Sequence, residues 1–328
     1  MTPELIRLSG EGVRREHGEA RTRRVGPVKA DFRVVGKGMT PTEAFRAVCA
    51  SCVQQVEANR HGVLAAVDPE YLHQMRVALR RLRTAFEVFA DAFPEASPLI
   101  GELRWLSRAL VRARDWDVFI AGTLKPAISA RPRHRGLRAL RAASESLAAE
   151  ARSAAHRALE SRRYYSLMRA LRALSYDGDG RSAGTVRALP MRVRALAVIS
   201  ALYAKARKRG RKLSRLGVKD LQRLRNAVRR LRYGLLFLEP LLPEARARAL
   251  AGTVEALQET LGGIKDCAVA KELISVARAE ARGPQRRKAR RILKKRVEAA
   301  RDARDRDLKR QWEDFRAAEK GWAGLRRA

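Results

Sequence analysis

A chain of 328 residues, of which 46% are apolar, can bury one large core or two of ordinary size. Its 71 Lys and Arg residues outnumber the 35 Asp and Glu residues and give a formal net charge of +36. Such an excess favours an anionic partner, namely nucleic acid, an acidic membrane surface or a smaller polyanion.

Three cysteines without regular pairing exclude a disulfide scaffold and fit a reducing compartment. The first residues show no signal-peptide pattern, and the longest apolar run, residues 195–204, is about half of a membrane-spanning length. We therefore expect a soluble, cytoplasmic protein without membrane contact. Part of the basic excess can be ordinary solvated helix surface, so the position of the cations matters more than their number.

The first half of the chain has the pattern of helices joined by short loops. Residues 1–37 are basic and lack any sustained period, so we expect a flexible arm with a short ordered approach near Val34. Thr40 and Pro41 fit the N-cap and first position of a helix, with Glu43 in its first turn. Apolar periodicity predicts helices over residues 41–59, 71–93, 97–124, 137–161 and 164–174, the third broken by Pro126.

The second half repeats this plan. Residues 175–190 cluster Gly, Asp and Ser and lose the apolar period, which indicates a linker. We expect helices over residues 191–209, 221–238, 244–276 and 286–320, with an interruption near Gly262 and Gly263. No segment reads as a strand. The prediction is an all-α fold with antiparallel neighbouring helices, divided into residues 38–174 and 191–328.

The segment from Tyr71 to Phe93 carries two neighbouring stripes. The apolar stripe contains Met75, Leu79, Leu82, Phe86 and Phe89. The basic stripe, at the same three- and four-residue steps, contains His73, Arg76, Arg80 and Arg83. At about 100° per residue the basic group falls within roughly 60° of Arg76 and lies beside the apolar group. A basic ladder at the edge of a packing surface is a candidate anion site.

The segment from Leu221 to Leu238 aligns with this helix without gaps. Arg225, Arg229 and Arg232 correspond to the three ladder arginines, and Gln222 takes the place of His73, at an offset of 149 residues (222 − 73). A second pair of segments, LSRALVRARDWDV from Leu106 and LQETLGGIKDCAV from Leu257, aligns at an offset of 151 (257 − 106). This pair matches Arg114 with Lys265 and Asp115 with Asp266. Two linked matches at nearly one offset indicate an internal duplication.

At these residues the sequence resembles the CHAD family, the conserved histidine α-helical domain. The resemblance rests on HQMRVALRRLR at residues 73–83, LRNAVRRLRY at 224–233, RARDWDV at 112–118 and LGGIKDCAV at 261–269. It covers roughly residue 34 to the C-terminus. It implies two tandem four-helix bundles, related by a pseudo-twofold axis, whose basic surface binds inorganic polyphosphate. Family members also target polyphosphate granules, and many are fused to a triphosphate-tunnel catalytic domain. We expect no such domain in the short N-terminal arm and interpret the chain as a stand-alone binding module.

The resemblance also implies which positions contact the anion. In the first half these are His73, Arg76, Arg80, Arg83 and Arg114, and in the second half Gln222, Arg225, Arg229, Arg232 and Lys265. Arg81 and Arg230 belong to the same motif but project about 140° away from the ladder, so we assign them to its rim or to a structural role. Gln222 stands where the family often has His, which weakens any mechanism that needs paired histidines. Val111 replaces the small Gly expected after Leu110, which suggests different helix packing in the first half.

Two of the motifs also admit metal chemistry. His73 could ligate a metal or act as an acid or base, but beside guanidinium groups we expect a hydrogen-bond donor to phosphate. Cys49 and Cys52 form a C-x-x-C without a second pair of ligands, so we interpret them as packing residues. We expect no metal and no cofactor.

The carboxylates do not form a pair that recurs in both halves. Asp115 recurs as Asp266, but Asp117 is replaced by Ala268, so we expect Asp115 to orient a guanidinium rather than to catalyse. Phosphate-binding glycine loops, nucleophile elbows and metal-spaced His/Glu clusters are not found in the sequence.

The leading hypothesis is a non-enzymatic module that binds polyphosphate, with granules and polyphosphate-metabolising enzymes as further expected partners. One alternative is RNA or DNA binding by the same surface, although only 5% of the residues are aromatic and could stack on bases. The other is a polyphosphate-processing enzyme.

Overall fold

The computed structural model describes residues 26–29, 33–89, 97–176, 190–283 and 285–323. All regular structure in these ranges is helical, and they contain no strand. The helices of the first half are α1 (Pro41–Leu64), α2 (Pro69–Val88), α3 (Ser97–Ala109), α4 (Val111–Phe119), the π-helical turn η3 (Ile120–Leu124), α5 (Lys125–Ser129), α6 (Arg135–Glu160) and α7 (Arg162–Ser175). Those of the second half are α8 (Met191–Gly210), η4 (Leu213–Arg215), α9 (Val218–Leu238), η5 (Glu239–Leu241), α10 (Glu244–Glu280) and α11 (Arg286–Ala323).

The predicted start of α1 is confirmed by a complete capping box. The Glu43 backbone N–H donates to Thr40 Oγ1 at 3.3 Å, and the Thr40 N–H donates to Glu43 Oε2 at 2.8 Å. The helix continues past residue 59 because Val63 is buried and Gly62 allows a close approach of α2. A Cβ on Gly62 would lie 2.2 Å from the Tyr71 ring, so only glycine fits there.

Two predicted helix breaks are wrong. Pro126 does not end the third helical stretch, since the π-helical turn places it in the first turn of α5, where its missing N–H needs no acceptor. Gly262 and Gly263 do not interrupt α10, which is continuous because its apolar face is buried on both sides of them. The break lies instead in the first half, at Leu110 between α3 and α4.

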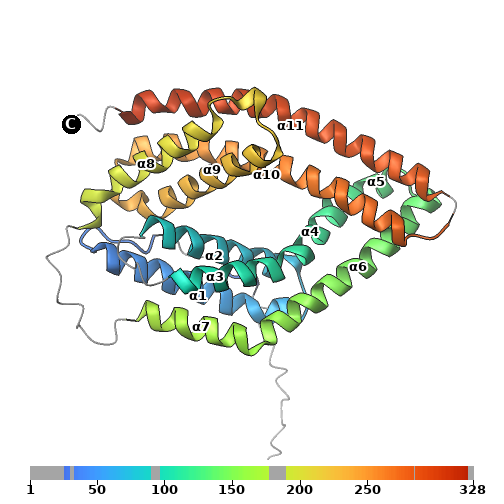
Figure 1. Cartoon of the computed structure of the whole chain (residues 1–328), viewed down its shortest axis with the longest axis horizontal. Coiled ribbons are helices and arrows are strands. Elements are labelled where there is room, and N and C mark those ends of the chain that lie inside the picture. Colours follow the sequence, from blue (N-terminus) through green and yellow to red (C-terminus); the bar gives the residue numbers. More distant parts are fainter. Residues whose placement is uncertain (1–25, 30–32, 90–96, 177–189, 284, 324–328) are drawn as a thin grey trace, which may run out of the picture.

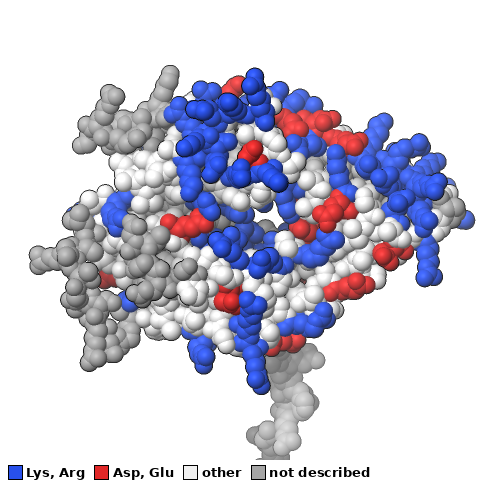
Figure 2. Space-filling view, viewed as in Figure 1, with Lys and Arg blue, Asp and Glu red and all other residues white. Residues whose placement is uncertain are grey.

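The helices form two groups that meet along α2 and α9 (Figure 1). α1, α3 and α7 lie on the α2 side, and α8, α10 and α11 lie on the α9 side. The long helices then extend away from this contact, and α6 of the first half meets α10 and α11 of the second at the far end. The space-filling view shows an opening in the middle of this face (Figure 2).

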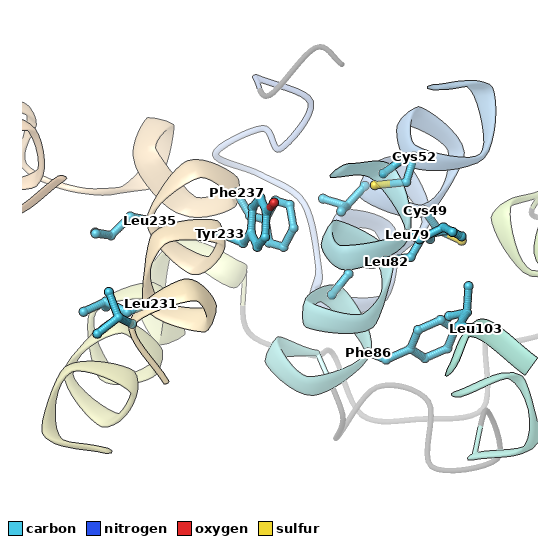
Figure 3. Close-up of a cluster of buried hydrophobic side chains, with 14 of the residues drawn as sticks. Cys49, Cys52, Leu79, Leu82, Phe86, Leu103, Leu231, Tyr233, Leu235 and Phe237 are labelled. Carbon is cyan, nitrogen blue, oxygen red and sulfur yellow. The ribbon is translucent and has the colours of Figure 1, made fainter. Parts of the chain in front are cut away.

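Both halves of the chain contribute to each hydrophobic cluster. The larger cluster joins α1, α2, α3 and α7 to α8, α9 and parts of α10 and α11. In Figure 3, Tyr233 and Phe237 of α9 point toward α2 and α1, where Leu79, Leu82 and Cys52 lie. The smaller cluster joins α4, α5 and α6 to α10 and α11. The boundary between residues 38–174 and 191–328 therefore separates two sets of helices but not two cores.

The segments assigned to the arm and the linker are only partly described. Within the predicted arm, the Val28 N–H donates to Asn59 Oδ1 at 3.0 Å and Val35 is buried, so these residues pack on α1 instead of forming a flexible chain. Residues 1–25 and 30–32 of the arm, and 177–189 of the predicted linker, lie outside the described residues. Across the helices that the structure describes, none combines the length and apolarity needed to cross a bilayer.

Candidate functional site

The two arginine ladders lie at the edge of the larger core. On α2 the neighbouring apolar residues Met75, Leu79 and Leu82 are buried, and on α9 the corresponding Leu224, Val228 and Leu231 are buried. The ladder arginines beside them are all half-buried: Arg76, Arg80, Arg83, Arg225, Arg229 and Arg232. Burial of the apolar stripe thus fixes the direction of both ladders, because the two stripes share each helix.

Packing of α2 against α9 brings the two ladders together. The charge of Arg76 interacts with Arg80 on its own helix and with Arg225 on α9, and Arg229 interacts with Arg225, Arg80 and Arg83. Figure 2 shows Lys and Arg side chains gathered around the central opening. The structure therefore brings together the arginines that the sequence alignment pairs at an offset of 149 residues (222 − 73).

This crowding changes the acid–base behaviour of the guanidinium groups. Burial, followed by repulsion from Arg80, lowers the pKa of Arg76 to about 10. Burial, followed by repulsion from Arg225 and Arg80, lowers the pKa of Arg229 to about 9. Burial also lowers the pKa of Arg225 and Arg83. Since both burial and like charge oppose the charged form, an anion between the ladders would relieve the strain on these groups.

His73 lies at the end of the α2 ladder and is half-buried. Burial and the charge of Arg114 lower its pKa to about 4, with smaller contributions of the same sign from Arg80 and Arg76. The imidazole is therefore neutral at pH 7 and has one N–H to donate and one nitrogen to accept. This fits a hydrogen-bond contact beside the arginines.

An ion pair between the halves flanks the ladders. Lys265 Nζ of α10 lies 2.6 Å from Asp115 Oδ1 of α4 and 3.8 Å from Asp266 Oδ1. Asp115 also acts on Arg76 and Arg225 through its charge, and Asp266 acts on Arg225. Asp115 thus holds a lysine directly and balances arginines at longer range, where we had expected it to orient a guanidinium.

Several of the residues predicted to contact the anion also bond to other protein groups, which fixes their side chains. Arg76 donates from Nη1 to the Ser107 carbonyl at 3.1 Å, and Arg229 donates from Nη2 to Asn226 Oδ1 at 2.7 Å. Arg232 pairs with Glu255 at 2.6 Å, at the outer end of its ladder. Gln222 is exposed and donates to Asn226 Oδ1 at 3.0 Å, so it does not replace His73 in a half-buried position.

Of the two roles left open for Arg81, rim or structural, its burial excludes the rim and fits the structural role. Its side chain is fully buried, donates to Gln55 Oε1 at 3.2 Å and has its guanidinium carbon 5.8 Å from the centroid of the Phe237 ring. It therefore joins α1, α2 and α9 inside the core. Arg230, at the corresponding position of α9, is half-buried and forms an ion pair with Glu87 of α2, with Nη2 2.8 Å from Oε1.

A cavity of about 810 Å³, which we call the central cavity, lies next to the Lys265–Asp115 ion pair, and no ladder arginine lines it. Asp115 and Asp266 line it together with other residues of α4, η3, α5, α10 and α11. Four of its lining residues are cations that the sequence analysis missed: Arg131, Lys295, Arg296 and Arg304. Gly263 makes room for one of them, because a Cβ there would lie 1.9 Å from Arg304 Nε. The basic residues are so frequent in α11 that its sequence alone gives no signal for these positions.

Cys49 and Cys52 lie in the core and not at this site. Burial raises the pKa of Cys49 to about 11 and that of Cys52 to about 12, so both thiols stay protonated and act as packing residues. Within the described residues, no group of three or more His, Cys, Asp or Glu is arranged to hold a metal ion.

The fold and the site define an all-helical domain with a shared internal basic surface. The family model of the CHAD domain matches residues 47–275, which is 229 of the 328 residues (275 − 47 + 1), and the chain belongs to this family. The structure is similar to the crystal structure of the CHAD domain from the plant Ricinus communis, with a TM-score of 0.77 and 30% identity over 89% of this chain and 97% of that one. It also shares its fold with PptA from Streptomyces chartreusis, with a TM-score of 0.64 and 14% identity over 84% and 99% of the two chains. A comparison with curated protein sequences gave no match.

Proposed function

We propose that this protein binds inorganic polyphosphate in the space between the two arginine ladders. The observation that supports this most directly is the convergence of half-buried arginines from α2 and α9, whose pKa values are lowered by burial and by one another. The CHAD family is linked to polyphosphate binding in general.

The geometry of the ladders suits a linear chain of phosphates. Arg76 and Arg83 are seven positions apart, about 10 to 11 Å along the helix axis, with Arg80 between them. Guanidinium groups bind phosphate oxygens in pairs, and a row of them can follow a linear polyanion without reading any base. We propose as anion contacts the ladder residues with His73, Arg114 and Lys265, and we leave out Arg81.

Nucleic acid is the second candidate for this surface. A single-strand binder normally presents aromatic side chains on which bases stack. Among the described residues the large exposed aromatics are Tyr165 and Tyr176, which lie in and just after α7 and not beside the ladders. This placement favours polyphosphate over a stacked single strand.

The proposal includes the origin of the site. Two aligned sets of helices would derive from a duplication and be related by a pseudo-twofold axis, so that each copy supplies one ladder. We propose a binding module without catalytic activity, which acts in the cytoplasm and associates with polyphosphate granules or with enzymes that make or consume polyphosphate.

Competition between two polyanions tests the proposal. Long-chain polyphosphate should displace a bound fluorescent oligonucleotide at a much lower phosphate concentration than the oligonucleotide needs to displace polyphosphate. Equal competition per phosphate would contradict a polyphosphate-specific site and favour a general polyanion surface. Incubation with long-chain polyphosphate and Mg²⁺, followed by an assay for released phosphate, tests the absence of catalysis, and release above that of a heat-denatured sample would contradict it.

A further inference from the structure

A second basic surface lies on the first turns of α11, outside the central cavity. Six cations line an open hollow of about 910 Å³ there, with Glu298 as the one acid: Arg287, Lys288, Arg290, Arg291, Lys294 and Lys295. Figure 2 shows Lys and Arg side chains gathered densely at the end of the molecule where α11 begins. We call these six residues the α11 patch.

The charge of the α11 patch is not balanced by the protein. In the part of the chain that the structure describes, none of the six cations has a carboxylate within ion-pair distance, and the Glu298 carboxylate lies 3.8 Å from Lys271 on α10 instead. Further along the same helix, by contrast, Arg301 pairs with Asp305 and Arg310 pairs with Asp307. Six like charges on three turns repel one another unless an anion covers them.

The spacing within the patch repeats that of the ladder on α2. Arg287, Arg291 and Lys294 stand at positions i, i+4 and i+7, as Arg76, Arg80 and Arg83 do. They therefore lie along one face of α11 over about 10 to 11 Å. Arg287 and Arg291 are exposed, so their charges are open to a ligand from solution.

Lys295 connects the patch with the central cavity. It lines both the α11 hollow and the 810 Å³ cavity that begins at Asp115 and Asp266. Arg296 and Arg304 line the cavity side of α11. Asp115, which interacts with Arg76 and Arg225 through its charge, lines the same cavity. The ladders, the cavity and the outer face of α11 thus follow one another, with Lys295 at the last junction.

We propose that the α11 patch binds the part of a long polyphosphate chain that extends out of the central cavity. This inference rests on the proposed function and adds a chain-length preference to it. A chain short enough to stay between the ladders touches only the central cations, whereas a long chain gains the contacts on α11. Affinity should therefore increase with chain length beyond what the number of phosphates alone gives.

The test uses the full chain with two probes, tripolyphosphate and long-chain polyphosphate, and measures affinity by isothermal titration at several salt concentrations. The test variant carries Arg287→Gln, Arg291→Gln and Lys294→Gln, which removes three charges and keeps side chains that favour a helix. Lys295 is kept because it also lines the central cavity. The control variant removes three exposed charges from the last turn of α6 and from α7, with Arg157→Gln, Arg162→Gln and Arg169→Gln. α7 lies on the opposite side of the molecule from α11 (Figure 1).

The test variant should bind long-chain polyphosphate about tenfold more weakly, since each exposed cation contributes a factor of roughly two to three. Its salt dependence should fall by about 2 in the slope of log K against log salt, from three lost contacts at roughly 0.7 each. Tripolyphosphate affinity should stay within about twofold, and the control variant should change neither probe beyond that range.

Two results would overturn the chain-length inference while leaving the central site in place. One is an equal loss for both probes, and the other is a loss for long-chain polyphosphate no larger than in the control variant. Failure of the proposed function looks different, because the unaltered protein would then bind neither probe, and the chain-length inference would fall with it.

Discussion

The same motif lies in two different environments on α2 and α9. The ladder arginines of both helices converge, but the residues next to them differ. Arg81 of α2 is buried against Phe237, while its counterpart Arg230 lies nearer the surface and pairs with Glu87. His73 is half-buried, while its counterpart Gln222 is exposed. The two helices therefore agree where their ladders face each other and differ where they contact the rest of the protein.

A second difference lies behind the ladders. In the first half Asp117 is buried and pairs with Arg152 of α6, Nη2 to Oδ1 at 3.0 Å, beside a small cavity of about 200 Å³. In the second half Ala268 replaces this aspartate. A pocket of about 420 Å³ lies beside Ala268, and Arg301, which also lines it, pairs with Asp305 on its own helix. The two halves therefore share the ladder arginines but differ in the residues behind them.

The largest expected effect tests whether both ladders form one site. Arg76→Glu with Arg80→Glu, and separately Arg225→Glu with Arg229→Glu, should each weaken polyphosphate binding by about 100- to 1000-fold, since each reversal exchanges a charge-assisted contact for a repulsion. Fluorescence anisotropy with labelled polyphosphate measures this. Circular dichroism should show unchanged helicity, because the apolar stripes are untouched. If only one pair of changes weakens binding, the ladders do not share a ligand.

Alanine substitutions of Arg81 and Arg230 should differ in their effect on stability, because the first side chain is in the core and the second is near the surface. Arg81→Ala should lower the free energy of unfolding by about 3 kcal/mol, since it leaves a cavity and removes the donor to Gln55 Oε1 inside the core. Arg230→Ala should cost less than about 1 kcal/mol, as expected for a partly exposed ion pair. Urea denaturation compares the two. Similar losses for both variants would contradict the difference in environment between α2 and α9.

Removing Arg152 should destabilise the protein more than removing Asp117, its ion-pair partner. Arg152→Ala leaves a buried carboxylate without its cation and should cost about 2 kcal/mol, whereas Asp117→Ala leaves a half-exposed guanidinium that water can reach and should cost about 1 kcal/mol. Arg301→Ala removes an ion pair between two residues of one helix, serves as the control and should cost less than about 0.5 kcal/mol. Thermal unfolding of the three variants gives the order, and a larger effect at Arg301 than at Arg152 would refute it.

The smallest effect concerns His73 and pH. Its pKa is about 4 in the folded protein against an ordinary value of 6.5, so between these values the unfolded chain binds more protons. Stability from this group is therefore complete above pH 6.5 and is lost as pH falls toward 4. His73→Gln, which copies Gln222, should remove this part of the pH dependence of urea denaturation.

The pH dependence of polyphosphate binding that His73 causes should have the opposite sign to the pH dependence of stability. A polyanion beside His73 raises its pKa, so the protein takes up a proton on binding, and affinity should rise as pH falls between 6.5 and 4. The His73→Gln variant should lack this proton uptake, which titration in two buffers of different ionisation enthalpy detects. Equal uptake by both proteins would show that another group titrates.

Helix positions and the phase of the ladders followed from the sequence because both are local properties. The 3.6-residue period of the apolar stripe places Arg76, Arg80 and Arg83 at its edge whatever the stripe packs against, and Thr40 with Glu43 fixes a helix start within four residues. The breaks at Pro126 and Gly262 were misplaced because a π-helical turn and the packing of α10 overrode local preference.

What only the tertiary structure decided is the environment of each side chain. Arg81 carries the same charge as Arg80 one residue earlier, yet it lies in the core because α9 packs over it. Lys295, Arg296 and Arg304 line the cavity because α11 folds back against α10, from which Gly263 leaves space. A sequence sets which residues share the face of one helix, but burial and charge crowding depend on contacts between helices far apart in the chain.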